Sequence, residues 1–139
     1  MIRAVIDTNV LVSGLLSPTG NEAIVLLAIR QGLVRPCFSA EIMAEYSEVI
    51  ARPKFSFGAE EIAAALAMFD ECGELVAPAG PPPVLPDLDD GKFLHCAEAA
   101  GAEYLVTGNK RHFPAGTYGA TRVVNAGELL DRITLEIRR

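Results

Sequence analysis

The chain has 139 residues, of which 50% are hydrophobic and 22% charged, and its formal net charge is −6. This length suits one domain with a proper core, and the composition excludes a disordered or fibrous chain. The acidic balance argues against a broad, non-specific nucleic-acid binder, which carries a strong basic surface. It is compatible with a nuclease whose own carboxylates gather around a metal ion.

Membrane and secretion signals are not recognised in the sequence. No apolar run approaches the roughly 18 residues that a membrane span requires, and the N-terminus lacks the pattern of a secretory signal. The three cysteines are scattered and form no CxxC pair: Cys37, Cys72 and Cys96. This usage indicates reduced thiols, so we expect a cytoplasmic protein that makes no contact with a membrane.

Apolar periodicity and cap signals predict alternating strands and helices. In chain order, the first half contains a strand at 2–6, a helix at 21–30 capped by Asn21, a strand at 33–38, a helix capped by Ser39 and stopped at Arg52-Pro53, and a helix at 59–72. The second half contains a strand at 75–77, a helix from Asp89 or Asp90 to Ala100, strands at 103–106 and 122–124, and a helix from 127 to about 137. Between them, PAGPPPVLP (78–86) can form neither a helix nor a central strand and is predicted to be a rigid surface connection.

The alternation of strands and helices predicts an α/β fold, a three-layer sandwich with a mainly parallel central sheet. We expect residues 1–139 to form a single domain, because neither side of the proline-rich stretch has enough elements for a core of its own.

Acidic and amide side chains are predicted to meet at one edge of this sheet. Two strands end in polar triplets, Asp7-Thr8-Asn9 and Thr107-Gly108-Asn109, and the cluster Asp87-Leu88-Asp89-Asp90 enters a helix at the same edge. In open α/β sheets the ligand crevice lies at the carboxyl ends of the strands. Carboxylates about 4 Å apart repel by a few kcal/mol, which a divalent cation removes. Oxygen ligands alone suit Mg²⁺ or Mn²⁺.

Simpler interpretations of the same residues stay open. Asp7 on its own is also typical of a turn cap, and one of the aspartates at 87, 89 and 90 is expected to serve only as an N-cap. Glu45 shares one helix face with Glu41 and Glu48, so its position alone does not mark it as functional.

Four stretches together resemble the PIN-domain family: VIDTNVLVSG, SAEIMAEYSEVIARPKF, PDLDDGKFLHCAEAAGAEYLVTGN and the following KRHF. The similarity covers nearly the whole chain and is greatest to the VapC-type branch, the toxin components of toxin–antitoxin modules. It implies a metal-dependent ribonuclease that cuts single-stranded or structured RNA with Mg²⁺ or Mn²⁺. It also implies a homodimer and a cognate antitoxin as partner.

The resemblance also implies a set of site residues. Asp7, Glu45 and Asp90 match the three acids that would bind the metal, and Asn109 stands where many members have a fourth acid. Some members carry the third acid one residue later, where this chain has Gly91.

Further residues are predicted to assist. The supporting positions around the acids are Thr8, Asn9, Asp87 and Thr107, and the residues expected to contact RNA phosphates are Lys110, Arg111 and His112. A solvated loop is the simpler interpretation of the last three.

Two alternatives belong to other functional classes. A PIN-fold module that binds RNA or protein without catalysis is favoured by the uncharged amide of Asn109. A phospho-aspartyl hydrolase using Asp7 as nucleophile is disfavoured, because that chemistry usually requires a second acid at position 9, where this chain has Asn9.

Overall fold

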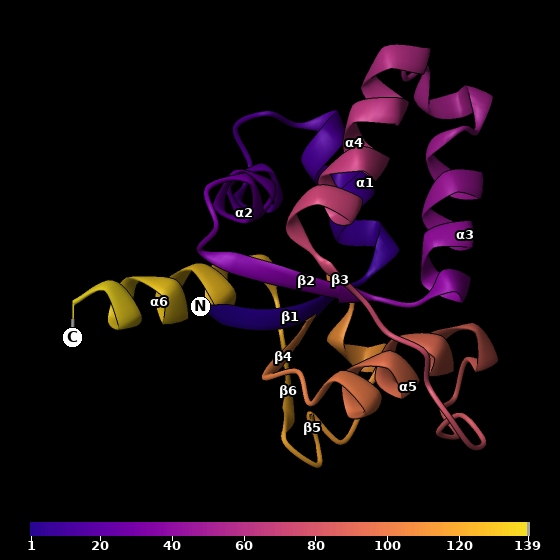
Figure 1. Ribbon diagram of the computed structural model, residues 1–139, viewed down its shortest axis with the longest axis vertical. Helices are drawn as coiled ribbons and strands as arrows, with labels where there is room; N and C mark the ends of the chain where they lie inside the picture. The colour runs from indigo at the N-terminus through magenta and orange to yellow at the C-terminus, as the bar shows by residue number, and fades with distance from the viewer. Residues whose placement is uncertain (139) are drawn as a thin grey trace.

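The structure, a computed structural model, describes residues 1–138 and is built around one six-stranded sheet with the strand order β3-β2-β1-β4-β6-β5 (Figure 1). The strands are Ile2–Ile6 (β1), Val34–Phe38 (β2), Glu74–Leu75 (β3), Tyr104–Val106 (β4), Thr117–Tyr118 (β5) and Thr121–Val124 (β6). Neighbouring strands are parallel except β5 and β6, which pair antiparallel. The prediction of an α/β fold with a mainly parallel sheet is confirmed.

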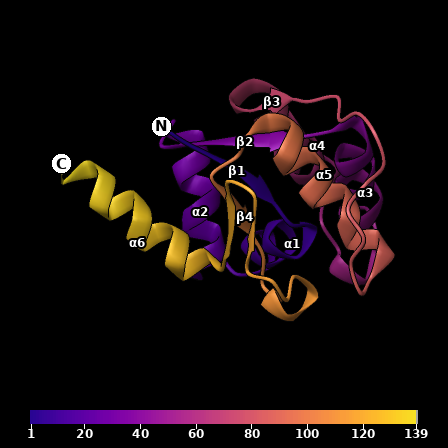
Figure 2. The same cartoon turned by 90° about the horizontal axis from the view of Figure 1, so that it is seen from below.

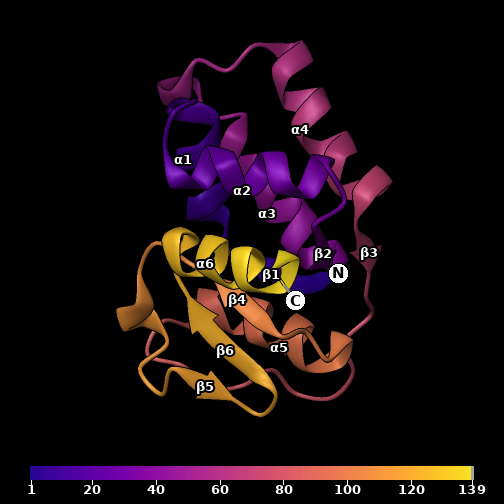
Figure 3. The same ribbon diagram turned by 90° about the vertical axis from the view of Figure 1, so that its left-hand side faces the viewer.

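Helices cover both faces of the sheet. They are Thr8–Leu16 (α1), Asn21–Arg30 (α2), Ala40–Ile50 (α3), Ala59–Cys72 (α4), Gly91–Ala100 (α5) and Ala126–Ile137 (α6), with short 3₁₀ turns at Pro53–Phe55 (η1), Leu88–Asp90 (η2) and Lys110–His112 (η3). Figure 1 shows α1 to α4 on one side of β1 and β2 and α5 on the other. The last helix, α6, packs beside α2 and projects away from the sheet towards the C-terminus (Figures 2 and 3).

The register of the central strands determines where the polar triplets emerge. Ile6 at the end of β1 pairs with Val106 at the end of β4, and the Asp7 amide donates to the Val106 carbonyl at 2.9 Å. The strands themselves are buried, and Ala4, Val5 and Ile6 have no exposed surface. Asp7 and Thr107 therefore leave the sheet side by side.

Helix boundaries agree well with the cap signals, with one exception. The Ser39 hydroxyl accepts from the Ile42 amide at 3.2 Å, which confirms this predicted cap. Asn21 is instead the first residue of α2, and Gly20 occupies the cap position without a side-chain bond, so the prediction of Asn21 as cap was wrong.

Three other elements differ from the sequence prediction. The chain does not turn after Asp7 but enters α1 directly, with Asp7 as its N-cap. The strand expected at 75–77 is Glu74–Leu75, and the two-residue β5 was not predicted. Within residues 1–138, no single helix is long and apolar enough to cross a membrane. The helices α1 and α2 meet the length and composition criteria only when taken together, and the angle between them is 101°.

Candidate metal centre

Asp7 is a buried carboxylate at the junction of β1 and α1. Only 6% of its surface is exposed. The Thr107 hydroxyl donates to Oδ2 at 2.7 Å, and the Asn9 amide approaches Oδ1 at 3.5 Å. Burial raises the pKa of Asp7, these two hydrogen bonds lower it, and the nearby charge of Glu45 raises it again, so that the net shift is upward. The Asp7 side chain is therefore the N-cap of α1 and is also affected by the charge of a second acid, Glu45.

The two polar triplets are tied to each other by hydrogen bonds. The Gly108 amide donates to Asn9 Oδ1 at 3.0 Å, and the Asn109 amide donates to the Thr107 hydroxyl at 3.1 Å. Thr107 is fully buried and bridges the Asn109 backbone to Asp7. Asn9 and Thr107 therefore hold the ends of β1 and β4 in one arrangement. Their supporting role at a metal site stays a prediction.

Asp90 presents a buried oxygen without a hydrogen bond. It ends η2, is only 7% exposed, and its Oδ2 has no hydrogen-bond partner among residues 1–138. Burial raises its pKa to about 6; the charges of Asp7, Asp87 and Glu45 add to this effect, whereas His112 opposes it. A buried oxygen in this state costs free energy unless a cation or a proton satisfies it.

The position after Asp90 is tight. Gly91 is buried, and a Cβ there would lie 3.1 Å from the Pro83 carbonyl oxygen, so that a side chain would require a shift of a few tenths of an ångström. In this chain Asp90, and not position 91, brings a carboxylate to the site.

Glu45 projects from α3 and is already paired. The Thr8 hydroxyl donates to Oε2, and Lys92 Nζ donates to Oε1 at 2.5 Å. The Lys92 and Glu45 side chains are 13% and 24% exposed. Burial lowers the pKa of Lys92, but the hydrogen bond and charge of Glu45 outweigh it and the net shift is upward.

Two residues of this region were missed by sequence reasoning. Lys92 follows the acidic run by two positions, and a lysine in the first turn of a helix has no signal beyond that of an ordinary solvated residue. Tyr46 has no sequence signal beyond its place in the helix predicted after Ser39, yet its buried hydroxyl donates to the Ile6 carbonyl and so fixes α3 to the end of β1. Burial raises the pKa of Tyr46 well above its ordinary value.

The three basic residues of η3 have different neighbours. Lys110 pairs with Glu128 of α6 at 2.9 Å, and Arg111 is exposed. His112 lies beside Asp90: its Nδ1 is 3.0 Å from Asp90 Oδ2, and its Nε2 is 2.9 Å from Asn109 Nδ2. The structure thus places His112 beside Asp90, whereas Lys110 is directed towards α6.

Asp87 completes the acidic cluster at its exposed edge. Its Oδ1 accepts from the Asp89 amide at 3.0 Å, and it caps η2. One ligand atom each from Asp87, Asp90 and His112 lie within 4.8 Å of one another. Asp89, in contrast, is exposed and contributes to no such group among the described residues.

The donors present fit a divalent cation. Asp7, Asp87 and Glu45 all act electrostatically on Asp90, and these four acids together are called the acidic crevice below. Within residues 1–138, Glu45 is the one of the four with an ammonium group as partner. Asp7 and Glu45 lie outside the 4.8 Å group of Asp87, Asp90 and His112. Oxygen-rich sites of this type hold Mg²⁺ or Mn²⁺, which would also satisfy Asp90 Oδ2. The arrangement can therefore bind a divalent metal and present it to solvent.

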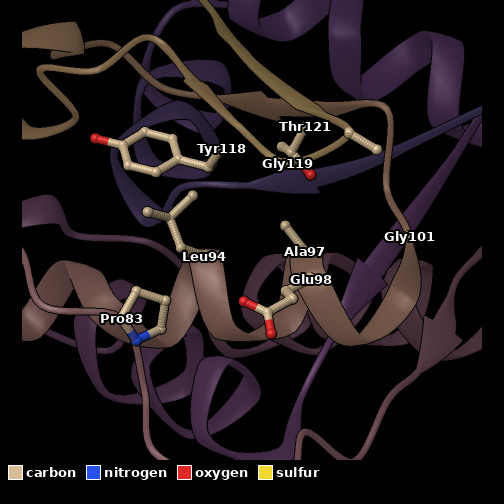
Figure 4. A pocket seen from close by; sticks show the side chains of 9 residues that line it. Pro83, Leu94, Ala97, Glu98, Gly101, Tyr118, Gly119 and Thr121 are labelled. Atoms are coloured by element: carbon tan, nitrogen blue, oxygen red, sulfur yellow. The ribbon is translucent and has the colours of Figure 1, made fainter.

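A separate apolar pocket lies behind α5, away from these acids. It has a volume of about 360 Å³, and Leu94 and Ala97 of α5 face Tyr118 and Thr121 of the β5–β6 hairpin across it (Figure 4). None of the acids described above lines this pocket.

Comparisons with known proteins agree with this geometry. The chain is similar in fold to a chain in a crystal structure of VapBC2 from Rickettsia felis bound to a DNA fragment from their promoter, with a TM-score of 0.56 and 16% sequence identity over 89% of this chain and 98% of that chain. A comparison with curated proteins found no match. A family model described as PIN domain matches residues 3–111, which cover β1 to β4 and every acid of the crevice. The chain belongs to the PIN domain family.

Proposed function

We propose that this protein is a metal-dependent endoribonuclease that hydrolyses RNA phosphodiester bonds and acts as the toxin of a toxin–antitoxin pair. The observation that carries the proposal is the buried Oδ2 of Asp90, which has no hydrogen-bond partner among residues 1–138. The negative charges of Asp7 and Glu45 act on the same carboxyl group and raise its pKa. Membership of the PIN domain family supports a nuclease, and the fold similarity to the VapBC2 chain is consistent with a toxin.

The acids have separate roles in this proposal. Asp7 and Asp90 would hold Mg²⁺ or Mn²⁺ directly, and Glu45 would complete the pocket through a water molecule or act as a base. An ion held there would supply polarisation of a phosphoryl oxygen and a lowered pKa of a water molecule. Thr107 keeps Asp7 oriented by its 2.7 Å hydrogen bond, and the Asn109 amide orients that water or a phosphate oxygen.

Substrate contacts outside the acids come from η3. Arg111 is exposed beside the crevice, so its guanidinium is available to an RNA phosphate, which it can bind by two hydrogen bonds. Lys110 reaches a phosphate only after it leaves Glu128, an exposed ion pair of low stability.

Partners follow from the toxin assignment. We expect a small antitoxin that covers the crevice, where the acids are a suitable receptor for an arginine side chain. We further expect a homodimer in the cytoplasm.

The test is cleavage of end-labelled RNA by wild type and by Asp7→Asn, each with Mg²⁺, Mn²⁺ or EDTA. We expect cleavage by wild type with either metal, and its loss on addition of EDTA and in Asp7→Asn. Equal cleavage by both proteins would identify a contaminating nuclease and remove Asp7 from the chemistry.

A non-catalytic RNA- or protein-binding module is the second candidate. It is favoured by the uncharged Asn109 and by the ion pair of Glu45 with Lys92, which occupies one acid of the crevice. RNA binding without cleavage, with metal affinity retained, would support this module over the nuclease.

A further inference from the structure

His112 lies against the acids of the candidate metal centre. The 3₁₀ turns η2 and η3 bring Asp87, Asp90 and His112 together, with one ligand atom of each within 4.8 Å of the other two. The Nδ1 atom of His112 is turned to the buried carboxylate of Asp90, at 3.0 Å from Oδ2.

The contact between Asp90 and His112 is an ion pair when His112 is protonated, and the side chains are 10% and 41% exposed, respectively. Oδ2 of Asp90 has no hydrogen-bond partner among the described residues, although Asp90 is only 7% exposed. Two neighbouring ligand atoms of an octahedral ion with bonds of about 2.1 Å lie about 3 Å apart. The Nδ1–Oδ2 separation has this value.

The other ring nitrogen of His112 is held by Asn109. Its Nε2 is 2.9 Å from Asn109 Nδ2. A metal-bound histidine commonly donates its second N–H to a neighbouring acceptor, which fixes the ring. The Asn109 amide can turn its oxygen to Nε2 and accept that hydrogen, which leaves the lone pair of His112 on Nδ1.

We propose that His112 Nδ1, Asp90 and Asp87 form a mixed nitrogen–oxygen site for a divalent transition-metal ion, so that this chain prefers Mn²⁺ to Mg²⁺. The inference deepens the proposed function, because it adds His112 and Asp87 beside Asp90, a ligand that the two proposals share, and names the class of metal. It rests on the premise that the acidic crevice takes a divalent cation. Mg²⁺ prefers oxygen ligands and retains its waters, whereas imidazole nitrogen suits transition-metal ions.

The test is direct detection of nitrogen bound to Mn²⁺. Metal-free full-length protein is titrated with MnCl₂, free Mn²⁺ is followed by electron paramagnetic resonance, and ¹⁴N coupling is measured by electron spin echo modulation. The sequence contains two histidines, so His95, which contacts the Ala79 carbonyl at 3.0 Å, provides the matched control.

We expect imidazole ¹⁴N coupling in wild type and in His95→Gln, and its loss in His112→Gln. The dissociation constant for Mn²⁺ should rise on the order of tenfold or more in His112→Gln, and competition should show a smaller change for Mg²⁺. Coupling that persists in His112→Gln, no coupling in wild type, or equal effects on both metals would overturn the proposal.

A second variant keeps the test informative if His112→Gln is poorly folded. Asp87 is exposed, and asparagine caps as well as aspartate does, so Asp87→Asn should fold normally. It should bind Mn²⁺ more weakly and keep the ¹⁴N coupling; unchanged affinity would remove Asp87 from the site.

Failure of this inference differs from failure of the proposed function. RNA cleavage by wild type with Mg²⁺, without ¹⁴N coupling on Mn²⁺, would keep the nuclease and overturn the histidine site. Coupling without cleavage would keep the site and overturn the nuclease.

Discussion

Lys92 Nζ lies 2.5 Å from Glu45 Oε1, so one acid of the crevice is neutralised by the protein itself. The ammonium group comes from the first turn of α5, next to Asp90, and joins α5 to α3. The pair thus links the two helices on either side of the crevice.

Replacing this lysine should make the fold depend more on metal. In EDTA we expect Lys92→Met to lower the free energy of unfolding by roughly 1–3 kcal/mol, because Glu45 keeps a partly buried charge without a partner. Added Mn²⁺ should restore more stability to this variant than to wild type, since the cation takes over neutralisation of Glu45. Urea unfolding with EDTA and with Mn²⁺ measures both effects.

The matched control is Lys110→Met, which removes an ion pair with exposed partners. Its loss should stay below about 1 kcal/mol. Equal losses in the two variants would show that burial of the Lys92–Glu45 pair has no energetic consequence.

Asp90 should make metal-free protein less stable as the pH rises. Its pKa is about 6 in the folded chain, above the ordinary value, so between pH 4 and 6 the folded state binds more protons than the unfolded state. The contribution of Asp90 to the free energy of unfolding is therefore greatest near pH 4 and falls as the pH rises through 6. The raised pKa of Asp7 acts in the same direction.

Asp90→Asn removes this penalty. In EDTA at pH 7 we expect the variant to be more stable than wild type by on the order of 1–2 kcal/mol, and the difference to shrink towards pH 4. Urea unfolding from pH 4 to 8 measures it, with the exposed Asp70→Asn as control. A stability difference that grows on acidification would contradict the prediction.

Two buried threonines allow an effect on activity to be distinguished from an effect on stability. Thr107 donates to Asp7, whereas Thr121 donates to the Ala102 carbonyl at 2.7 Å, away from the acids. Each threonine changed to valine should lose about 1–2 kcal/mol of stability. Only Thr107→Val should also lose activity, by roughly 10- to 100-fold, because Asp7 loses the bond that favours its charged form.

Cleavage rates and urea unfolding of both threonine variants give the comparison. Similar loss of activity in Thr121→Val would show that the effect reports stability alone.

The Tyr46 hydroxyl should stabilise the junction of α3 and β1. Tyr46→Phe leaves the buried Ile6 carbonyl with one donor fewer, so we expect the free energy of unfolding to fall by about 1–2 kcal/mol. Tyr104→Phe, at a half-buried tyrosine, is the control and should change little. Thermal or urea unfolding of both variants measures the difference, and equal stability would argue against the bond.

Sequence patterns were informative where a helix has a polar face. The ranges of α2 and α4 follow directly from the helical spacing of their apolar residues. In α1 this signal is missing, because TNVLVSGLL carries no charge and is buried on several sides, so its spacing does not distinguish helix from strand. The two-residue β5 is too short to show any period.

In the candidate site, too, some positions could be predicted from the sequence and others could not. Strand ends and helix starts place Asp7, Thr107 and Asp90 at one edge, which the alternation of elements predicts. The direction of a side chain in a turn has no such pattern, so neither the contact of His112 with Asp90 nor the pairing of Lys92 with Glu45 could be predicted from the sequence.

The two edge strands of the sheet, β3 and β5, have only two residues each. An edge this short offers few free backbone groups for a further strand, which also limits edge-to-edge aggregation. A peptide that recognises this protein by strand addition would find almost no template. Recognition of this protein by a partner would therefore depend on side-chain contacts with helices and loops, where sequence changes can alter specificity without altering the sheet.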